Sequence, residues 1–335
     1  MNAKLKPLSD QTVVITGASS GIGRVTALEA ARRGARVVLT GRNEPVLRDL
    51  AEQIATSGGL ARFKAADVGR REEVEAVAAL ALSEFGGFDT WVNNAGVAMF
   101  SRLEETVEED ARRLFDTNFW GMVHGSLTAL KTLKVSGGAL VNVGSIAGDF
   151  GVPVQGMYSA SKHAVRAFTD TIRIELESEA APVSVTLIKP AAVATPIISN
   201  LGNTTGREAK LPAPHYAPEE VAHAILYAAE HPQRDIYVGG TGRLMSLFAQ
   251  AAPHLADKVS ARFGEEAQLG DAETSHVDNL HQPREHRAKH DATDRGRRSF
   301  YTRATLDPNS PIAAATAASG ALFDLALSIL APRKK

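Results

Sequence analysis

Short apolar runs alternate with longer amphipathic stretches along most of the chain. Thr12 to Thr16 and Arg36 to Thr40 are rich in β-branched residues, and similar runs lie near residues 61, 88, 138, 183 and 235. Such runs are typical of strands buried on both faces. The stretches between them have helical periodicity, among them Glu44 to Thr56, Glu72 to Phe85 and Glu219 to Glu230. Repeated strand–helix–strand units connect parallel strands through right-handed crossovers, so the pattern predicts an α/β fold with a doubly wound sheet of seven parallel strands and helices on both faces.

A glycine-rich turn joins the first strand to the first helix. It reads Thr-Gly-Ala-Ser-Ser-Gly-Ile-Gly from Thr16 to Gly23, and the helical stretch Val25 to Arg33 follows. Glycine permits a tight turn and the close approach of a pyrophosphate, while the first amides of the helix present N–H donors and a positive dipole end. The turn therefore predicts a Rossmann-type dinucleotide site. Its contacts are expected from Gly17, Ser19, Ser20, Gly21, Ile22 and Gly23.

The end of the second strand bears on the choice between NAD(H) and NADP(H). A carboxylate at this place commonly binds the ribose of NAD, but this strand ends in Gly41-Arg42. Because no carboxylate repels a 2′-phosphate, the forked guanidinium of Arg42 can pair with it, and Arg24 is a second candidate cation. The sequence therefore favours NADP(H) over NAD(H). The other interpretation is that both arginines are solvated surface charges.

A second motif near the middle of the chain suggests proton transfer. Tyr158 and Lys162 begin a predicted helix from Tyr158 to Glu179, and their spacing of four places them on one face. A free tyrosine titrates near pH ~10, and a nearby ammonium lowers that pKa by favouring the phenolate. Ser145 follows an apolar strand and so lies at the carboxyl edge of the sheet, where it could donate to a substrate carbonyl. Asn118 lies within the helical region Val107 to Leu133, where an asparagine more often marks a local kink than a catalytic group.

With these motifs in this order, residues 8 to 240 resemble the short-chain dehydrogenase/reductase family. The family's TGxxxGxG motif corresponds to Thr16 to Gly23 and its NNAG motif to Asn93 to Gly96. The resemblance implies that Tyr158 is the acid/base and that Lys162 holds the nicotinamide ribose and lowers the pKa of Tyr158. It also implies that Ser145 orients the carbonyl and that Asn118 supports a proton relay through water.

The resemblance implies further cofactor contacts as well. Asp67 and Val68 resemble the pair that contacts adenine, and the contacts around the nicotinamide and its ribose fall on Asn94, Ala95, Gly96, Tyr158, Lys162, Pro190, Val193 and Thr195. One motif departs from the family, because Ala191 stands where a glycine usually follows Pro190. A Cβ forbids some backbone angles, so this loop is where the resemblance is weakest.

These observations predict an NADP-dependent oxidoreductase that interconverts a ketone or aldehyde with an alcohol by hydride transfer. The partner would then be a small-molecule carbonyl or alcohol. The alternative is a non-catalytic NADP-binding redox sensor or scaffold that uses the C-terminal extension for interaction. Neither the substrate nor the physiological direction can be inferred from the sequence.

The chain divides into three predicted parts. Residues 1–263 form a catalytic domain, in which about 191–218 is an irregular stretch expected to be a substrate lid rather than an inert loop. Arg243 to Phe263 is predicted as two helices broken at Pro253, with apolar positions that favour packing on the core over lining the substrate cleft. Residues 264–310 are polar and are predicted to form a disordered tether. Residues 311–335 are predicted as an apolar C-terminal helix.

Composition narrows the class of protein. The 335 residues have a formal net charge of -1, which is too balanced to indicate nucleic-acid binding. The chain has no cysteine, and no metal site is predicted, although His286 and His290 have a spacing of four. The N-terminal residues contain no apolar stretch of signal-peptide length, which predicts a cytoplasmic location. A homodimer through the helices of Asn118 and Tyr158, and peripheral membrane contact through the C-terminal helix, stay open.

Overall fold

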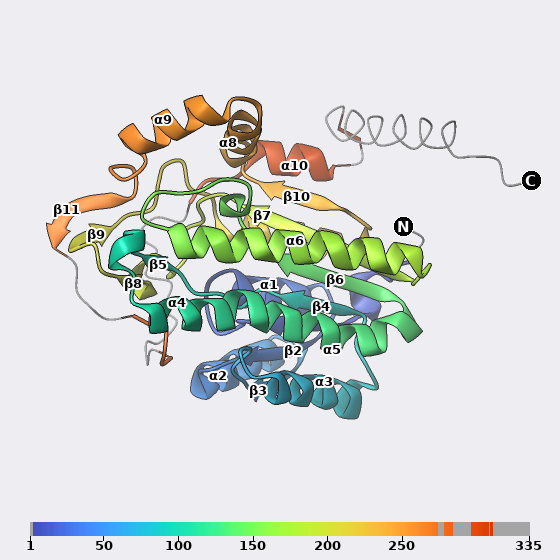
Figure 1. Cartoon of the computed structure of the whole chain (residues 1–335). Helices are drawn as coiled ribbons and strands as arrows, with labels where there is room; N and C mark the ends of the chain where they lie inside the picture. The colour runs from blue at the N-terminus through green and yellow to red at the C-terminus, as the bar shows by residue number, and fades with distance from the viewer. Residues whose placement is uncertain (1–2, 274–277, 284–295, 308, 311–335) are drawn as a thin grey trace, which may run out of the picture.

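Seven parallel strands form the centre of the molecule. The computed structural model describes residues 3–273, 278–283, 296–307 and 309–310. The sheet has the order β10-β7-β6-β4-β1-β2-β3, and every pairing in it is parallel, as predicted (Figure 1). The strands are β1 (Thr12–Thr16), β2 (Arg36–Gly41), β3 (Leu60–Ala65), β4 (Thr90–Asn93), β6 (Gly138–Val143), β7 (Val183–Pro190) and β10 (Asp235–Val238).

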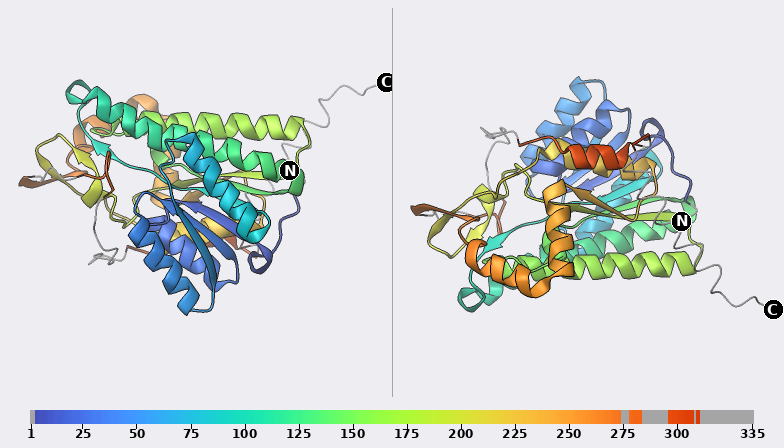
Figure 2. Two further views of the ribbon diagram at one scale, coloured as in Figure 1. Left: turned by 90° about the horizontal axis from the view of Figure 1, so that it is seen from below. Right: turned by 90° about the horizontal axis from the view of Figure 1, so that it is seen from above.

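Helices cover both faces of this sheet (Figure 2). Successive side chains of a strand point to opposite faces, and β1 shows the result. Val13 and Ile15 pack with α1 (Gly21–Arg32), α2 (Glu44–Thr56) and α7 (Pro218–Glu230), whereas Val14 packs with α3 (Arg71–Phe85), α5 (Gly121–Ser136) and α6 (Gly156–Ser178). Burial on both faces explains why the strands are apolar throughout rather than alternating.

The region predicted as one helix from Val107 to Leu133 is interrupted in the middle. It consists of α4 (Glu108–Phe115), a π-helical turn η3 (Asp116–Trp120) and α5. Such π-helical turns are rare and occur often at functional sites, because the extra residue redirects the side chains that follow. Here the turn contains Asn118, so the asparagine marks both a local distortion and a candidate site.

The predicted lid after β7 crosses the carboxyl ends of the strands. It contains the 3₁₀ turn η5 (Ile198–Asn200) and two short strands, β8 (Gly202–Asn203) and β9 (Arg207–Ala209). Strand β8 pairs with β5 (Met99–Phe100), and β9 pairs with β11 (Leu269–Glu273). The stretch is therefore held at two places by pairing with distant parts of the chain.

Two helices follow Gly239, and Pro253 begins the second, as predicted. They are α8 (Gly240–Ala251) and α9 (Pro253–Phe263). Their apolar residues do not cover the core, however, which corrects the prediction: the large hydrophobic side chains are exposed, namely Leu244, Met245, Leu247, Phe248, Leu255, Val259 and Phe263. The reason is that α8 buries its small residues, Gly242 and Ser246, and so turns its larger ones outward.

The predicted tether over residues 264–310 is ordered wherever the structure describes it. It contributes β11, the segment 278–283 and α10 (Phe300–Leu306). The polar composition led to the prediction, but the segment needs no core of its own, because Leu269, Leu280 and Leu306 are buried against the catalytic domain. His286, His290 and the predicted helix over 311–335 lie outside the described residues.

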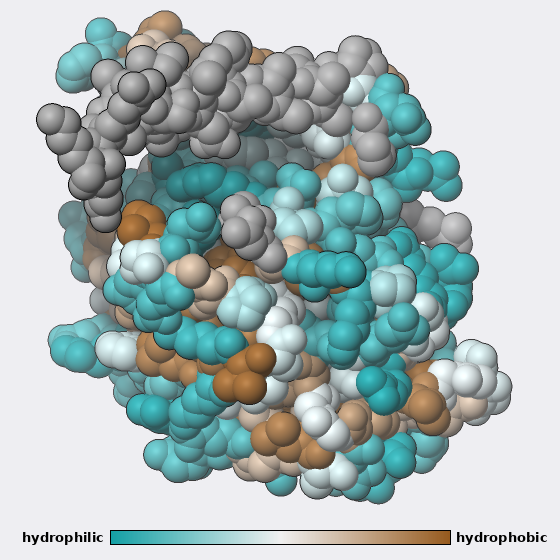
Figure 3. Space-filling view, turned by 90° about the vertical axis from the view of Figure 1, so that its right-hand side faces the viewer, coloured by the Kyte–Doolittle hydropathy of each residue, from teal (hydrophilic) through white to brown (hydrophobic). Residues whose placement is uncertain are grey.

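The molecular surface is mixed. Where residues are coloured in Figure 3, hydrophobic side chains occur in small groups among hydrophilic ones. Within the described ranges, no helix is long and apolar enough to cross a bilayer. The same part of the chain contains no cluster of three or more side chains suited to hold a metal ion.

Candidate active site and cofactor groove

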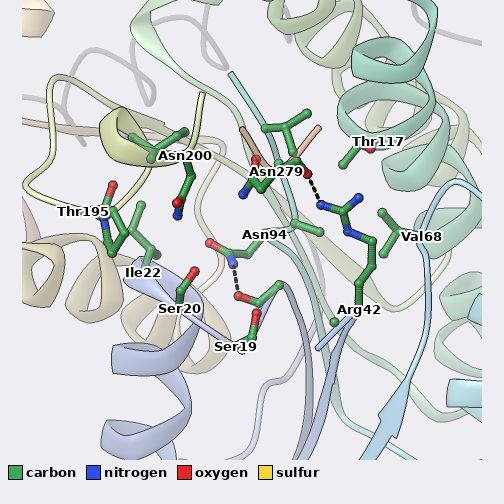
Figure 4. Close-up of a pocket in the computed structure, with 18 of the residues that line it drawn as sticks. Ser19, Ser20, Ile22, Arg42, Val68, Asn94, Thr117, Thr195, Asn200 and Asn279 are labelled. Carbon is green, nitrogen blue, oxygen red and sulfur yellow. Dashed lines mark hydrogen bonds between the residues drawn. The ribbon is translucent and has the colours of Figure 1, made fainter. Parts of the chain in front are cut away.

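The glycine-rich turn between β1 and α1 forms one wall of a long groove (Figure 4). Gly17 and Gly21 have positive φ angles of 65° and 49°, which favour glycine. A Cβ on Gly23 would lie 2.2 Å from the carbonyl oxygen of Gly17, so this glycine permits close packing behind the turn rather than lining the groove. Ser20 is the N-cap of α1, and the first helical amides follow it at the groove.

The Asn93–Gly96 segment fixes this turn from the neighbouring strand. Thr16 Oγ1 accepts hydrogen bonds from the backbone N–H groups of Asn94 at 2.9 Å and Ala95 at 3.0 Å. In return, Asn94 Nδ2 donates to the carbonyl oxygen of Thr16 at 2.9 Å. The two sequence motifs are therefore one hydrogen-bonded unit, and Asn94, Ala95 and Gly96 line the groove beside the glycine turn.

Arg42, Asp67 and Val68 line the groove at the ends of β2 and β3. Asp67 accepts hydrogen bonds from Arg113 Nη2 at 2.6 Å and from the N–H of Gly69 at 3.0 Å. Burial alone would raise the pKa of Asp67, but these hydrogen bonds outweigh burial and lower it. The carboxylate is therefore ionised at neutral pH and held in place.

The two candidate cations differ in position. The guanidinium of Arg42 is at the groove, where it donates to backbone carbonyls of residues 279–281. Arg24 donates instead to Gln53 Oε1 of α2 at 2.7 Å and is not among the residues that line the groove. The α1 helix turns the Arg24 side chain toward α2, so of these two arginines Arg42 is the one that lines the groove.

A second cavity of about 290 Å³ adjoins the groove, and Ile22, Asn94 and Thr195 line both. Ser145, Tyr158 and Lys162 lie in its wall together. Most of its remaining lining is apolar, with Phe100, Ile146, Val152, Ile197, Leu211 and Met245 among the residues. Three polar groups in an apolar cavity beside a nucleotide groove are the arrangement expected of a small-molecule enzyme.

Burial sets the protonation of the two titratable groups in this cavity. It raises the pKa of Tyr158, and a hydrogen bond with Ser145 counters only part of that shift. It lowers the pKa of Lys162 to about 8. Lys162 Nζ donates to the carbonyl oxygen of Val143 at 3.2 Å and lies 5.7 Å from the centre of the Tyr158 ring. Burial thus raises the pKa of Tyr158, in contrast to the lowering by Lys162 that the resemblance implies.

Asn118 lies behind this cavity, not in its lining. Its amide is paired with the backbone of Val97, accepting from the N–H at 2.8 Å and donating to the carbonyl oxygen at 2.9 Å. It also donates to Ser161 Oγ at 3.3 Å. From the π-helical turn, the Asn118 amide thus connects the loop between β4 and β5 with the helix of Tyr158.

The loop after β7 accommodates Ala191 without strain. Its φ is not in the positive range, and its N–H donates to the carbonyl oxygen of Val238 at 2.9 Å. Its methyl group is packed so close to Gly242 of α8 that a Cβ on that glycine would lie 2.8 Å away. Pro190, Val193 and Thr195 line the cavity.

Sequence reasoning missed several residues of the site. Asn279 lines the groove, Arg113 donates to the carbonyl oxygen of the neighbouring Leu280, and Gln155 and Gln268 form a hydrogen-bonded pair at the cavity. None belongs to a motif, and Asn279 and Gln268 come from the segment predicted as a tether. Tertiary contacts between distant parts of the chain bring these residues to the site.

Comparison with known proteins agrees with this geometry. Residues 11–206 match the model of the short chain dehydrogenase family. The chain is 44% identical, over 91% of its length and 88% of the relative's, to an uncharacterised oxidoreductase of Bacillus subtilis, YxnA. It is 32% identical, over 68% of its length and 91% of the relative's, to a 3β-hydroxysteroid dehydrogenase of Mediterraneibacter gnavus.

Solved structures give the same result. An alcohol dehydrogenase of the archaeon Thermococcus sibiricus complexed with 5-hydroxy-NADP matches with a TM-score of 0.61 and 28% identity, covering 68% of this chain and 95% of that one. A short-chain dehydrogenase/reductase of Burkholderia phymatum in complex with NAD matches with a TM-score of 0.69 and 26% identity, covering 75% and 96%. The protein belongs to the short-chain dehydrogenase/reductase family. It is an oxidoreductase that acts on CH–OH groups with NAD(P).

Proposed function

We propose that the protein is an NADP-dependent oxidoreductase that interconverts a ketone or aldehyde with an alcohol, with Tyr158 as the acid/base. The observation that carries this proposal is the grouping of Ser145, Tyr158 and Lys162 in one apolar cavity beside the dinucleotide groove. The groove residues fit a nicotinamide dinucleotide, because the glycine turn and the start of α1 line it together with the cation Arg42. When bound, NADPH would supply the hydride.

The remaining steps belong to this chain's own residues. The Ser145 hydroxyl holds the substrate oxygen, and the phenol of Tyr158 gives it a proton in reduction and takes one back in oxidation. The raised pKa keeps Tyr158 protonated at neutral pH, the state from which it can donate. Lys162 binds the nicotinamide ribose, and Asn118 joins the loop after β4 to the Tyr158 helix so that the proton path stays aligned.

The cavity supports an apolar substrate. Aromatic and aliphatic side chains such as Phe100, Val152 and Leu211 line the same cavity as the polar residues of the proposed chemistry. They would favour a hydrophobic ketone or secondary alcohol over a charged substrate. The related protein named for a hydroxysteroid supports the same class of substrate. A screen of hydrophobic alcohols and ketones, followed by nicotinamide absorbance with each cofactor, would identify the substrate for the tests below.

Replacing Tyr158 by Phe tests the chemistry. We expect Tyr158→Phe to lower kcat by at least about 100-fold, the scale of general acid–base catalysis, with NADPH affinity changed only a few-fold. Tyr227→Phe is the matched control, because that ring stacks on His231 at 4.3 Å, away from the cavity. Undiminished turnover in Tyr158→Phe would refute the role of Tyr158.

Replacing Arg42 by Asp tests the cofactor. The variant places a carboxylate where we expect the 2′-phosphate, so the Kd of NADPH should rise by at least about tenfold while that of NADH changes little or falls. Arg24→Asp is the control, since Arg24 contacts Gln53 instead of the groove. An unchanged preference in Arg42→Asp would contradict the assignment of Arg42.

A further inference from the structure

The segment 278–283 crosses the adenosine end of the cofactor groove. On one side, the N–H of Asn279 donates to the carbonyl oxygen of Asn200 in the predicted lid at 2.9 Å. On the other side of the groove, backbone carbonyls of the segment accept hydrogen bonds from Arg42. Figure 4 shows Asn279 next to Arg42. Between them, the Leu280 side chain is 1% exposed and packs in a cluster with Val97, Met99 and Leu114. The segment is therefore anchored across the groove.

Two arginines converge on a single oxygen of this segment. The carbonyl oxygen of Leu280 accepts from Arg42 Nη1 at 2.9 Å and from Arg113 Nε at 3.1 Å. Arg42 also donates to the carbonyls of Asn279 and His281. The two guanidinium groups repel each other, and although Asp67 pairs with Arg113, the hydrogen-bond acceptors of Arg42 are neutral carbonyls. A phosphate would offer charge and several oxygens to both arginines.

We propose that Arg42 and Arg113 together form the site for the 2′-phosphate of NADP(H), and that the Leu280 carbonyl occupies this site until the phosphate displaces it. The inference rests on the proposed use of NADP(H) and adds a second specificity-determining residue, Arg113. It also gives residues 278–283 a role, as an internal competitor of the 2′-phosphate.

The charges around the two arginines indicate that the segment 278–283 competes with the 2′-phosphate and does not help to bind it. With the segment in place, Arg42 and Arg113 face two carboxylates, because Asp67 pairs with Arg113 and Asp278 lies near Arg42. Asp278 Oδ1 also accepts from the N–H of Leu280 at 2.8 Å, so carboxylate and carbonyl belong to one turn. When this turn moves away, the site loses one negative charge and the oxygens that hold Arg42. Both changes favour a dianionic phosphate.

The role of Arg113 can be tested by binding alone, without turnover. Isothermal titration with adenosine 2′,5′-bisphosphate and adenosine 5′-monophosphate isolates the 2′-phosphate. We expect Arg113→Met to weaken binding of the bisphosphate at least tenfold and that of the monophosphate less than threefold. Arg112→Met is the matched control, since Arg112 is on the same helix and pairs with Glu108 at the exposed surface. Equal losses for both ligands would overturn the proposal, because Arg113 would then only hold Asp67.

The role of the segment can be tested in the same assay. Asp278→Asn and Leu280→Ala should tighten the bisphosphate several-fold and leave the monophosphate within about twofold. In the unaltered chain, hydrogen exchange of residues 278–283 should accelerate with saturating bisphosphate and not with monophosphate. Weaker bisphosphate binding in both variants, or slower exchange, would overturn the proposal and make the segment a wall of the site. None of these outcomes depends on Tyr158 chemistry, whose failure would appear in the turnover of Tyr158→Phe.

Discussion

At the scale of single residues, burial decides the protonation of the groups that carry the proposed chemistry. Tyr158 keeps its proton because ionised phenol is poorly solvated in the apolar cavity, and Lys162 loses its proton more readily for the corresponding reason. An ammonium held by one carbonyl, that of Val143, is incompletely compensated. A cofactor ribose would supply the oxygens that this ammonium lacks, which supports the proposed role of Lys162 in cofactor binding.

The lysine makes a prediction about stability. In the unfolded chain Lys162 keeps its proton to about pH 10.5, but in the folded protein it loses it near pH 8. Between these values the unfolded state binds more protons, so the free energy of unfolding should rise with pH. Relative to a Lys162→Met variant, we expect wild-type stability to increase between pH 8 and 10 by about 2–3 kcal/mol. Urea unfolding of both proteins at several pH values would check this, and parallel curves would contradict it.

At the scale of elements, α10 shows how a polar segment is fixed without a core of its own. Glu220 of α7 is buried, with its side chain 1% exposed, and accepts from Arg303 at 2.6 Å and from the N–H of Ser299 at 3.1 Å. The N–H of Thr302 donates to Ser299 Oγ at 3.1 Å, and Thr302 Oγ1 accepts from the N–H of Gly239 at 3.0 Å. Leu306 packs in the main hydrophobic core. A few such contacts hold α10 against α7 and the end of β10.

This ion pair gives an element-scale prediction. Arg303→Met leaves a buried carboxylate without its cation, and we expect a loss of about 2–3 kcal/mol in the free energy of unfolding, because the half-exposed Arg303 side chain lets water replace part of the interaction. The double variant Glu220→Met, Arg303→Met should lose less free energy of unfolding than Arg303→Met alone, because no buried carboxylate is left without its cation. Arg298→Met, at an exposed position nearby, is the control. Chemical denaturation would measure all three, and a neutral Arg303→Met would show that α10 is held by its apolar contacts.

At the scale of the whole molecule, α5 and the Tyr158 helix α6 each carry exposed apolar side chains. Leu127 and Val135 of α5 and Ile174 of α6 are 44%, 86% and 69% exposed, and the two helices lie side by side (Figures 1 and 2). We propose that two copies of the chain pair through this face. Such pairing would bury these side chains and stiffen the helix of Tyr158.

Light scattering coupled to size exclusion tests this pairing. We expect twice the 35.6 kDa mass of one chain for the wild type and a single-chain mass for the double variant Leu127→Asp, Ile174→Asp. Leu82→Asp is the control, because Leu82 is 48% exposed on α3 and outside this face. A wild-type protein with the mass of one chain would refute the dimer.

The parts of this protein that depend on local geometry follow from neighbouring residues along the chain. β-branched runs such as Thr12–Thr16 form buried strands, Gly17 and Gly21 supply the φ angles of the phosphate turn, and a spacing of four places Tyr158 and Lys162 on one helix face. These features need only neighbours along the chain, which is why pattern and motif predicted the fold and most groove residues.

The tertiary structure alone decided which distant residues meet. Arg42 and Leu280 are 238 positions apart, and no local pattern indicates that a polar C-terminal segment would reach the groove. Composition suggested disorder there, yet the described parts of this segment are held by anchors such as Leu280 and the pair of Glu220 and Arg303. Packing also directed Arg24 to Gln53 and the apolar side chains of α8 to the surface. Such choices depend on the sum of contacts across the folded chain, which periodicity does not encode.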